Sequence, residues 1–368
     1  MKIGQVTMCG DNYGACLQAF ALQYVLRKMH GEIEYIRYSR GASKERVSTF
    51  SKLCALGVKG LVHYLKEYSF IKKRKKSFAL FREKYIVKSP VSYGNGYDLN
   101  VLAEKYDAFI CGSDMIWSEE FQEDWNFYFL NFAPKAKSFS YAPSFGKNAL
   151  SEENKKRVRD YLNEFSRITC REEGGVDLIE SISNIAVKQV LDPTMLLSIY
   201  EWNEVINTRE RIIEHPFVFM YLFGTEDSAR KQYINDIEKK YGKAYKLPSC
   251  RKEARKFPVD SIGPIEYLRL FRDAEFIVTD TFHGLMFSLI FNKQFVVLNR
   301  TDASNWAKYS DRMTSTLNMF GLADRYILAN KMKVDNLAKI DYNLINKKIC
   351  AKRNESRIYL NEIVGDVE

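Results

Sequence analysis

The chain has 368 residues, of which 46% are hydrophobic and 28% are charged, and its formal net charge is +10. This composition excludes a disordered acidic tail and a low-complexity segment. No stretch approaches the roughly 20 consecutive apolar residues of a membrane-spanning helix, so we expect a soluble protein. Because a single hydrophobic core stops growing at roughly 250–300 residues, the length predicts about two domains.

The cysteines and histidines are scattered along the chain. The seven cysteines form no Cys-x-x-Cys pair, and the four histidines are far apart. This pattern has neither metal-ligand nor disulfide spacing, so it favours a reducing cytoplasm and predicts no metal ion. The first residues also lack the order of a secretory signal. We therefore expect a cytoplasmic protein.

Short apolar, β-branched runs alternate with helical periodicity, which is typical of parallel sheets flanked by helices. In the first half the predicted strands are 3–8, 34–38, 108–111, 138–142, 168–170 and 188–191, and the predicted helices are 16–28, 53–84, 151–164 and 175–181. In the second half the predicted strands are 217–223, 275–279 and 295–298, and the predicted helices are 228–241, 264–272, 285–291 and 310–320. The fold class is therefore predicted as α/β, with two Rossmann-like domains.

The sequence Leu191-Asp192-Pro193-Thr194 ends the first series, because proline cannot continue a strand ladder. We place the hinge at residues 195–203, which predicts an N-terminal domain over 1–195, a C-terminal domain over 203–340 and a terminal helix within 341–368. Two open sheets joined in this way leave a central cleft between them. Ligands bind such sheets at the carboxyl ends of the strands.

The first of these strand ends carries Asp11, Asn12, Tyr13 and Gly14 ahead of a helix. Glycine allows close backbone approach, and a helix N-terminus binds anions. The segment matches neither the dinucleotide nor the P-loop fingerprint, which disfavours both kinds of site. A plain strand-to-helix turn is the alternative interpretation.

Two further strand ends are polar. Ser113, Asp114 and Trp117 follow strand 108–111, and this combination of hydroxyl, carboxylate and indole suits a sugar. The alternative is that Asp114 caps a helix and Trp117 fills the core. Ser144 and Lys147 follow strand 138–142 and are candidates for contact with a phosphate.

Arg171 follows strand 168–170, and its planar guanidinium suits two-pronged contact with a carboxylate or phosphate. A structural ion pair with Glu172 or Glu173 is the alternative. His283 has the clearest setting, because it lies where the apolar strand 275–279 gives way to a polar turn and an apolar helix. A bound phosphate at that position favours the imidazolium, as a general acid requires.

The excess positive charge is densest in the run Lys72-Lys73-Arg74-Lys75-Lys76, within a helical pattern. A solvated helix face is the interpretation we favour. Binding to a membrane surface and binding to nucleic acid are the two alternatives.

Taken together, six motifs resemble the polysaccharide pyruvyl transferase family. They are Asn12-Tyr13-Gly14-Ala15, Gly112-Ser113-Asp114-Met115-Ile116-Trp117, Ser140-Tyr141-Ala142-Pro143-Ser144-Phe145-Gly146, Arg171-Glu172-Glu173, Leu191-Asp192-Pro193-Thr194 and Asp280-Thr281-Phe282-His283-Gly284. The resemblance implies two domains facing a cleft, as in GT-B glycosyltransferases. It also implies that phosphoenolpyruvate donates its pyruvyl group to two hydroxyls of one sugar as a ketal, with release of phosphate and no other cofactor.

The resemblance assigns acid–base catalysis to His283 and donor binding to Arg171, and we expect Asp114 to accept a proton from the sugar. The other expected donor contacts are Thr281, Gly284, Ser144 and Lys147, and the expected acceptor contacts are Asp11, Asn12, Tyr13, Gly14, Ser113 and Trp117. Many family members carry arginine where this chain has Thr281. The missing charge must then come from Arg171 with Lys147 or Arg300, or the donor is held differently.

The partners implied are phosphoenolpyruvate and a saccharide acceptor, free or lipid-linked, with peripheral contact at the inner membrane surface in the lipid-linked case. No nucleic acid is expected, and the sequence does not specify an oligomer. Two rival functions share these features. One is a GT-B glycosyltransferase that uses a nucleotide sugar, and the other is a catalytically silent sugar- or RNA-binding protein.

Overall fold

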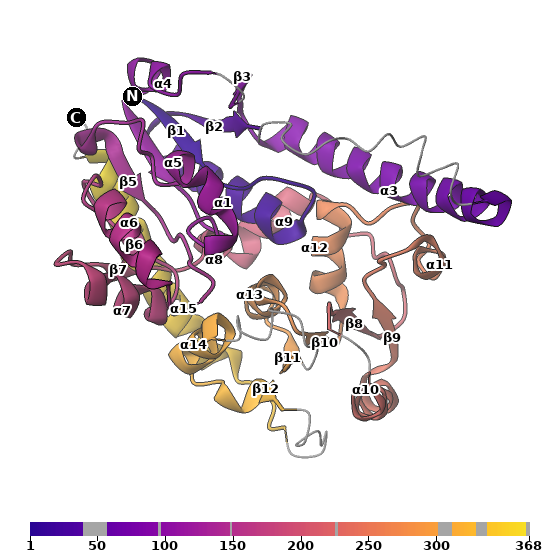
Figure 1. The fold of residues 1–368 in the computed structure, drawn as a ribbon. Coiled ribbons are helices and arrows are strands. Elements are labelled where there is room, and N and C mark those ends of the chain that lie inside the picture. The colour runs from indigo at the N-terminus through magenta and orange to yellow at the C-terminus, as the bar shows by residue number, and fades with distance from the viewer. Residues whose placement is uncertain are drawn as a thin grey trace.

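The computed structural model describes residues 1–39, 57–94, 97–147, 149–224, 227–300, 311–328 and 337–365. Residues 53–56 and 310 of two predicted helices, and the end of the predicted terminal segment, lie outside these ranges. Figure 1 shows two α/β halves, one above the other, with helices packed between the two sheets. Both main sheets are parallel, so the predicted fold class is confirmed.

The N-terminal sheet has the strand order β3-β2-β1-β4-β5, which is the Rossmann order. Its strands are β1 (Lys2–Val6), β2 (Glu32–Tyr38), β3 (Lys88–Tyr93), β4 (Ala108–Cys111) and β5 (Ser138–Ser140), and β6 (Thr169–Cys170) and β7 (Lys188–Gln189) form a separate short pair. The helices of this half are α1 (Tyr13–His30), α3 (Gly57–Tyr85), α4 (Val101–Lys105), α5 (Trp125–Tyr128), α6 (Glu152–Leu162) and α7 (Glu173–Ile182), with 3₁₀ turns at Glu119–Asp124 and Lys135–Lys137.

The C-terminal sheet has the order β12-β11-β10-β8-β9, with the order reversing between β8 and β10. Its strands are β8 (Phe217–Tyr221), β9 (Lys243–Lys246), β10 (Phe276–Thr279), β11 (Gln294–Leu298) and β12 (Tyr326–Ile327). The helices that follow the first series of strands are α8 (Pro193–Leu196), α9 (Ile199–Ile206), α10 (Ser228–Tyr241), α11 (Arg251–Ala254), α12 (Pro264–Asp273), α13 (Phe282–Ile290), α14 (Asp311–Phe320) and α15 (Tyr342–Gly365), with a 3₁₀ turn at Ala323–Arg325.

The sequence pattern missed strands β3, β9 and β12, all at sheet edges. Edge strands face solvent on one side, so β3 and β9 contain lysine in place of an apolar run, and β3 also contains serine and Pro90. The segment 195–203, where we expected the hinge, runs through α8 and α9 and is largely buried. Trp202 of α9 packs between Phe20 of α1 and Phe287 of α13, with ring centroids 5.7 and 5.4 Å apart. The division at this segment stays a prediction.

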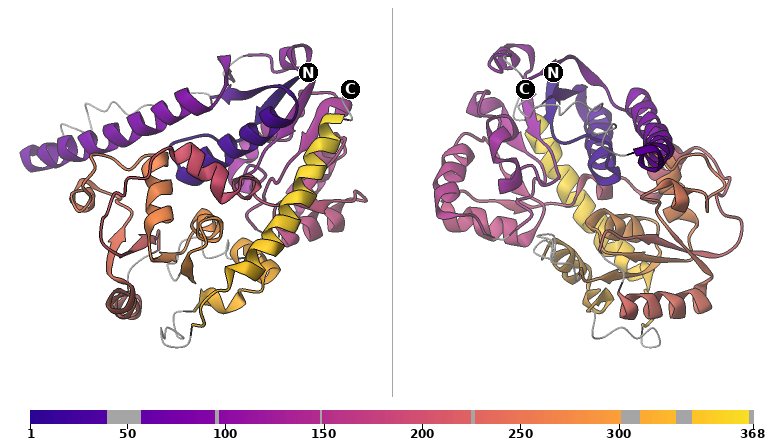
Figure 2. Two further views of the ribbon diagram at one scale, coloured as in Figure 1. Left: turned by 180° about the vertical axis from the view of Figure 1, so that it is seen from behind. Right: turned by 45° about the vertical axis from the view of Figure 1, so that its right-hand side comes forward.

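The terminal helix α15 returns to the N-terminal half and passes alongside both halves (Figure 2). Arg353 donates to the carbonyl oxygen of Met195 at 2.7 Å, and the hydroxyl of Ser356 accepts from the amide of Leu191 at 3.1 Å. These contacts fix the backbone on both sides of the Asp192-Pro193 turn.

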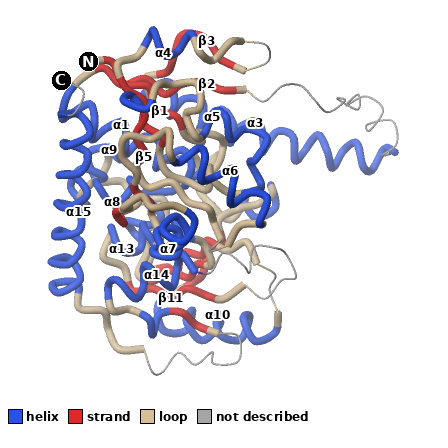
Figure 3. The backbone as a smooth tube through the Cα atoms, turned by 60° about the vertical axis from the view of Figure 1, so that its left-hand side comes forward, coloured by secondary structure: helices blue, strands red, loops and turns tan. Residues whose placement is uncertain are grey.

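In Figure 3 one end of α3 extends well beyond the rest of the protein. Among the described residues, no helix combines the length and hydropathy needed to cross a bilayer.

Candidate functional site

The site lies where the two sheets turn their strand ends toward each other. In each sheet the strand order reverses at one point, between β1 and β4 and between β8 and β10, and ligands bind at such points. The loops after these four strands line one cavity of about 540 Å³. Its lining residues are Met8, Asn12, Ala15, Asp114, Met115, Phe121, Tyr221, Phe223, Thr281, Phe282, His283, Arg300 and Arg312. The cavity is therefore built jointly by the two halves.

His283 is placed by the start of α13. Strand β10 ends at Thr279, and Thr281 has extended backbone angles and caps α13 by accepting from the amide of Gly284 at 3.0 Å. The imidazole then lies against Gly14 of the other half, where a Cβ atom would approach Nδ1 of His283 to 2.1 Å. Glycine at position 14 is thus required by this close approach rather than by its own backbone angles. Gly14 positions the histidine.

Asp192 faces the other side of the imidazole. Its Oδ2 atom lies 3.7 Å from Nε2 of His283 and 3.1 Å from Nη1 of Arg171, and it accepts from the hydroxyl of Ser113 at 3.1 Å. The other carboxylate oxygen caps α8 by accepting from the amide and the hydroxyl of Thr194. Asp192 is fully buried, so its charge depends on these partners.

The electrostatics of this group favour a charged Asp192. Burial by itself raises the pKa of its carboxyl, but the His283 imidazole and the Arg171 guanidinium more than offset this and hold that pKa well below its usual range. For Arg171, burial by itself lowers the pKa, and the carboxylates of Glu172 and Asp192 outweigh it and raise the pKa above its ordinary value. Nε2 of His283 has no hydrogen-bond partner within the described ranges. This atom is buried and faces the carboxylate of Asp192.

The closest contacts of Arg171 are with other side chains of the protein. Its Nε atom lies 2.6 Å from Glu172, and its guanidinium stacks 4.1 Å from the ring centroid of Phe282. The ion pair that we weighed as the alternative for Arg171 is thus present, and Arg171 is not among the residues that line the cavity. Arg171 contacts Asp192 and Phe282, and of these two residues Phe282 lines the cavity. Donor binding by Arg171 stays a prediction.

Asp114 lies across the cavity in a strained backbone conformation. Its φ angle is +81°, which is uncommon for a residue other than glycine, and its side chain accepts from the next amide, that of Met115, at 2.9 Å. Strained residues of this kind gather at functional sites. The geometry therefore agrees with a catalytic role for Asp114, which stays a prediction.

Two arginines that line the cavity bring positive charge to it. Arg300 donates to the backbone carbonyl of Asp280 at 3.0 Å and lies 3.6 Å from its carboxylate. Arg312 of α14 lies with its guanidinium 5.7 Å from the ring centroid of Phe282. Burial and then the nearby Arg171 lower the pKa of Arg312 to about 10. A pKa of about 10 still leaves Arg312 a cation at neutral pH, so it brings positive charge to the cavity.

Several expected contacts lie elsewhere. Trp117 is fully buried and stacks on Phe129 at 4.8 Å, so it packs in the core. Tyr13 is also buried, because its ring stacks on Tyr267 and its hydroxyl donates to Ile262 across the interface. Acceptor contact by these two residues stays a prediction, and the physical reason for their burial is the same. An aromatic ring after a buried strand gains more from packing than from exposure.

The two serines are buried as well, and their contact with a ligand stays a prediction. Ser113 has no exposed surface and bonds to Asp192, so it supports the ion-pair network. Ser144 is buried, and its hydroxyl accepts from the amide of Gly146 at 2.9 Å. Lys147 lines a small hollow beside Arg312 rather than the main cavity.

The remaining expected contacts divide between the cavity and its surroundings. Asn12 and Thr281 line the cavity. Asp11 pairs with Arg82 at 2.9 Å outside it. The amide of Gly284 is taken up by Thr281, so it is not free to bind a donor.

Sequence reasoning did not assign a role to Asp192 or to Arg312. Asp192 was visible as part of Asp-Pro-Thr after a strand, but that pattern also describes an ordinary helix cap. Arg312 carries no local signal, because it is one of many arginines on helices. The aromatic lining residues are Tyr221, which ends β8, and Phe223, two residues further on, and their place at a strand end was the only indication.

One comparison with known proteins identifies a family. The sequence model described as polysaccharide pyruvyl transferase matches residues 12–302, which is well over half of the chain. No curated protein matches at a significant level.

Solved structures give remote likenesses. UDP-GlcNAc 2-epimerase from Methanocaldococcus jannaschii, in complex with UDP-GlcNAc and UDP, is 13% identical, with 97% of this chain and 94% of that chain covered and a TM-score of 0.48. The heptosyltransferase WaaC of E. coli, with ADP-2-deoxy-2-fluoro heptose, is 12% identical, with 95% and 99% covered and a TM-score of 0.38.

Proposed function

Because the chain belongs to the polysaccharide pyruvyl transferase family, we propose that it transfers the pyruvyl group of phosphoenolpyruvate to a sugar. The product is a ketal on two hydroxyls of one sugar, within a cell-surface polysaccharide or its precursor, and phosphate is released. The reaction takes place in the cytoplasm and uses no metal ion. The acceptor is free or carried on a lipid.

One observation carries this proposal, namely the cationic side of the cavity next to His283. Arg300 and Arg312 line the same cavity as the histidine, so two guanidinium groups lie beside it. Phosphoenolpyruvate carries a phosphate and a carboxylate, and arginine binds both groups. Position 281 holds threonine where many family members have arginine, and in this proposal Arg300 and Arg312 supply the positive charge instead.

The reaction needs a proton donor and a proton acceptor. His283 donates a proton to the methylene carbon of the donor, which leaves cationic character at the adjacent carbon. A first sugar hydroxyl forms a bond to that carbon and loses its proton to Asp114. A second hydroxyl then displaces phosphate, which leaves with the donor's bridging oxygen and electron pair. The proton of the second hydroxyl returns to His283, and the proton on Asp114 passes to the released phosphate. Asp192 holds the protonated imidazole in place, as a carboxylate beside a catalytic histidine does.

The aromatic side of the cavity suits the acceptor. Phe223 is 59% exposed and lies beside Tyr221, with ring centroids 5.1 Å apart. Rings exposed in this way offer an apolar face on which a sugar can stack, and Asn12 offers an amide for hydrogen bonds to hydroxyls. Donor and acceptor thus meet between the cationic side and the aromatic side.

Ligand-induced thermal stabilisation tests the proposal against its rivals. Phosphoenolpyruvate should raise the melting temperature of the protein, whereas UDP-sugars and a single-stranded oligonucleotide should not. With phosphoenolpyruvate and a panel of aryl glycosides, mass spectrometry should find an acceptor that gains the elements of pyruvate minus one water. Stabilisation by UDP-sugars alone would instead support a glycosyltransferase.

A variant separates catalysis from binding. His283→Ala should lower phosphate release by about 10²–10⁴-fold while the protein stays folded, because the imidazole lines the cavity and supports little of the core. His215→Ala is the matched control, since His215 lies near β8 and bonds to Tyr245 instead. Wild-type phosphate release from His283→Ala would remove the histidine from the mechanism.

A further inference from the structure

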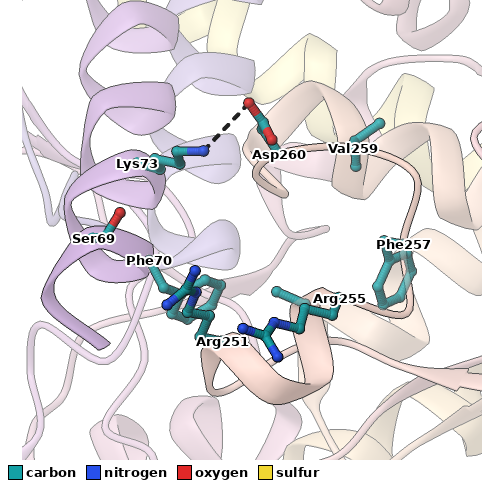
Figure 4. A pocket seen from close by; sticks show the side chains of 9 residues that line it. Ser69, Phe70, Lys73, Arg251, Arg255, Phe257, Val259 and Asp260 are labelled. Carbon is teal, nitrogen blue, oxygen red and sulfur yellow. Dashed lines mark ion pairs between the residues drawn. The ribbon is translucent and has the colours of Figure 1, made fainter. Parts of the chain in front are cut away.

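A second hollow lies between the two halves, away from the cavity with His283. It has a volume of about 240 Å³ and lies between α3 and α11 (Figure 4). Its lining residues are Ser69, Phe70, Lys73, Arg251, Ala254, Arg255, Phe257, Val259 and Asp260. Three of them are cationic and one is a carboxylate, so the hollow is positively charged, with the buried rings of Phe70 and Phe257 at its apolar side.

The positive charge continues along α3. Ser69, Lys72, Lys73 and Lys76 are spaced three or four residues apart, so they share one face of the helix. Lys72 and Lys76 are exposed, and Lys73 lies only 3.3 Å from Asp260. On α11 and just after it, Lys252 and Lys256 are exposed as well. We call this surface of α3 and α11 the basic edge.

Arg74 is the exception in the run. Its guanidinium lies over the rings of Tyr13 and Phe78, at 5.1 and 5.8 Å from their centroids. It thus packs against the interface between the halves, whereas its neighbours on either side face outward. The run is therefore not a uniform solvated helix face.

An exposed aromatic ring accompanies the exposed cations. Tyr68 is 49% exposed and lies one turn from Lys72, so the two share a face of α3. Exposed apolar groups beside lysines are typical of helices that lie in the surface of a bilayer, and the positive charge of this surface complements anionic lipid headgroups.

From these contacts we propose that the basic edge binds the anionic surface of a lipid bilayer, with a lipid phosphate in the hollow between α3 and α11. Lys73, Arg251 and Arg255 surround the phosphate, Lys72 and Lys76 contact neighbouring headgroups, and Tyr68 enters the interface. This goes beyond the transfer reaction and does not depend on it.

The position of the basic edge also links it to the cavity. Arg82 of the same helix donates to the backbone carbonyl of Gly10 and to the carboxylate of Asp11, in the loop that carries Asn12. Ten residues of helix separate Lys72 from Arg82, which is about 15 Å. A protein docked through the basic edge therefore holds its cavity close to the bilayer, where a lipid-linked acceptor would be. Only this last statement rests on the proposed function.

Vesicle co-sedimentation of the full chain tests the proposal. At low salt the protein should pellet with vesicles of equal parts phosphatidylcholine and phosphatidylglycerol, but not with pure phosphatidylcholine, and added salt should release it. The double variants Lys72→Gln/Lys76→Gln and Lys73→Gln/Arg255→Gln should each weaken binding by about tenfold or more. Tyr68→Ser should weaken binding without reducing its salt dependence.

The matched control removes the same charge elsewhere. Lys239→Gln/Lys240→Gln changes two exposed lysines of α10 and should leave vesicle binding unchanged. Equal loss in control and basic-edge variants, equal binding to both vesicle types, or tighter binding to a single-stranded oligonucleotide than to the anionic vesicles would overturn the proposal. Donor stabilisation by phosphoenolpyruvate should persist in all variants, so a failure here is distinguishable from a failure of the proposed function.

Discussion

Nε2 of His283 lies 3.7 Å from Oδ2 of Asp192, and the two residues come from different halves of the chain. Asp192 closes the β-strand series of the N-terminal half, and His283 opens α13 of the C-terminal half. The buried carboxylate is held from behind by Arg171, so it is fixed in place before any ligand arrives. Relative movement of the halves would therefore change the distance on which the histidine depends.

Gly14→Ala should disable the site without changing any charge. The new methyl group would lie 2.1 Å from Nδ1 of His283, so the ring must move away from its present position. We expect phosphate release to fall by about 10²-fold, since catalysis is sensitive to displacements of about 1 Å. Steady-state kinetics would measure this.

The same loop offers a control for that variant. Gly10→Ala places a methyl group where no atom lies within 4 Å, so its turnover should match the wild type. Similar losses in both variants would show that the loop as a whole, and not the contact with His283, is sensitive.

Asp192→Asn should make stability less dependent on acid pH. The folded-state pKa of Asp192 lies below its unfolded value of about 3.9, so its carboxylate stabilises the fold above that pH and loses the effect as the pH falls. At neutral pH the variant should be less stable by about 3 kcal/mol, because it breaks a buried ion pair with Arg171. The difference between variant and wild type, measured by urea unfolding, should shrink below about pH 4. A constant difference across that range would contradict this account of Asp192.

Arg312→Gln should separate donor binding from stability. Burial and Arg171 disfavour the charge of Arg312, so its removal should leave the melting temperature of the free protein unchanged or raise it. The stabilisation by phosphoenolpyruvate should shrink, since a cation of the cavity is lost. Differential scanning fluorimetry with and without the donor measures both. Full donor stabilisation in the variant would exclude Arg312 from the donor site.

Thr281→Val should weaken the helix rather than the donor site. Valine matches the shape of threonine but removes the oxygen that accepts from Gly284, so the cap of α13 is lost at a cost of about 1 kcal/mol. Donor affinity measured by calorimetry should change little, because that hydroxyl already bonds to Gly284 and to Thr279. A large loss of donor affinity with unchanged stability would assign Thr281 to the donor instead.

The amino-acid sequence determined the features that depend on neighbouring residues. The apolar run before Asp280 forms β10, the threonine at 281 caps a helix, and His283 therefore stands at a strand's carboxyl end, as predicted. The two parallel sheets followed from the same alternation of short apolar runs and helical periodicity. Such signals are local, because backbone preferences and capping act over a few residues.

Only the tertiary structure decided which of these residues meet. Asp192 is an ordinary helix cap by its sequence, and it becomes the partner of His283 because α8 packs between the halves. Trp117 and Phe223 both follow strands, yet one is buried against Phe129 and the other is exposed. Likewise, Arg74 turns inward among outward-facing lysines. The physical reason is that the burial and the pairing of a side chain depend on which distant segments pack against it. The neighbouring residues in the sequence do not contain that information.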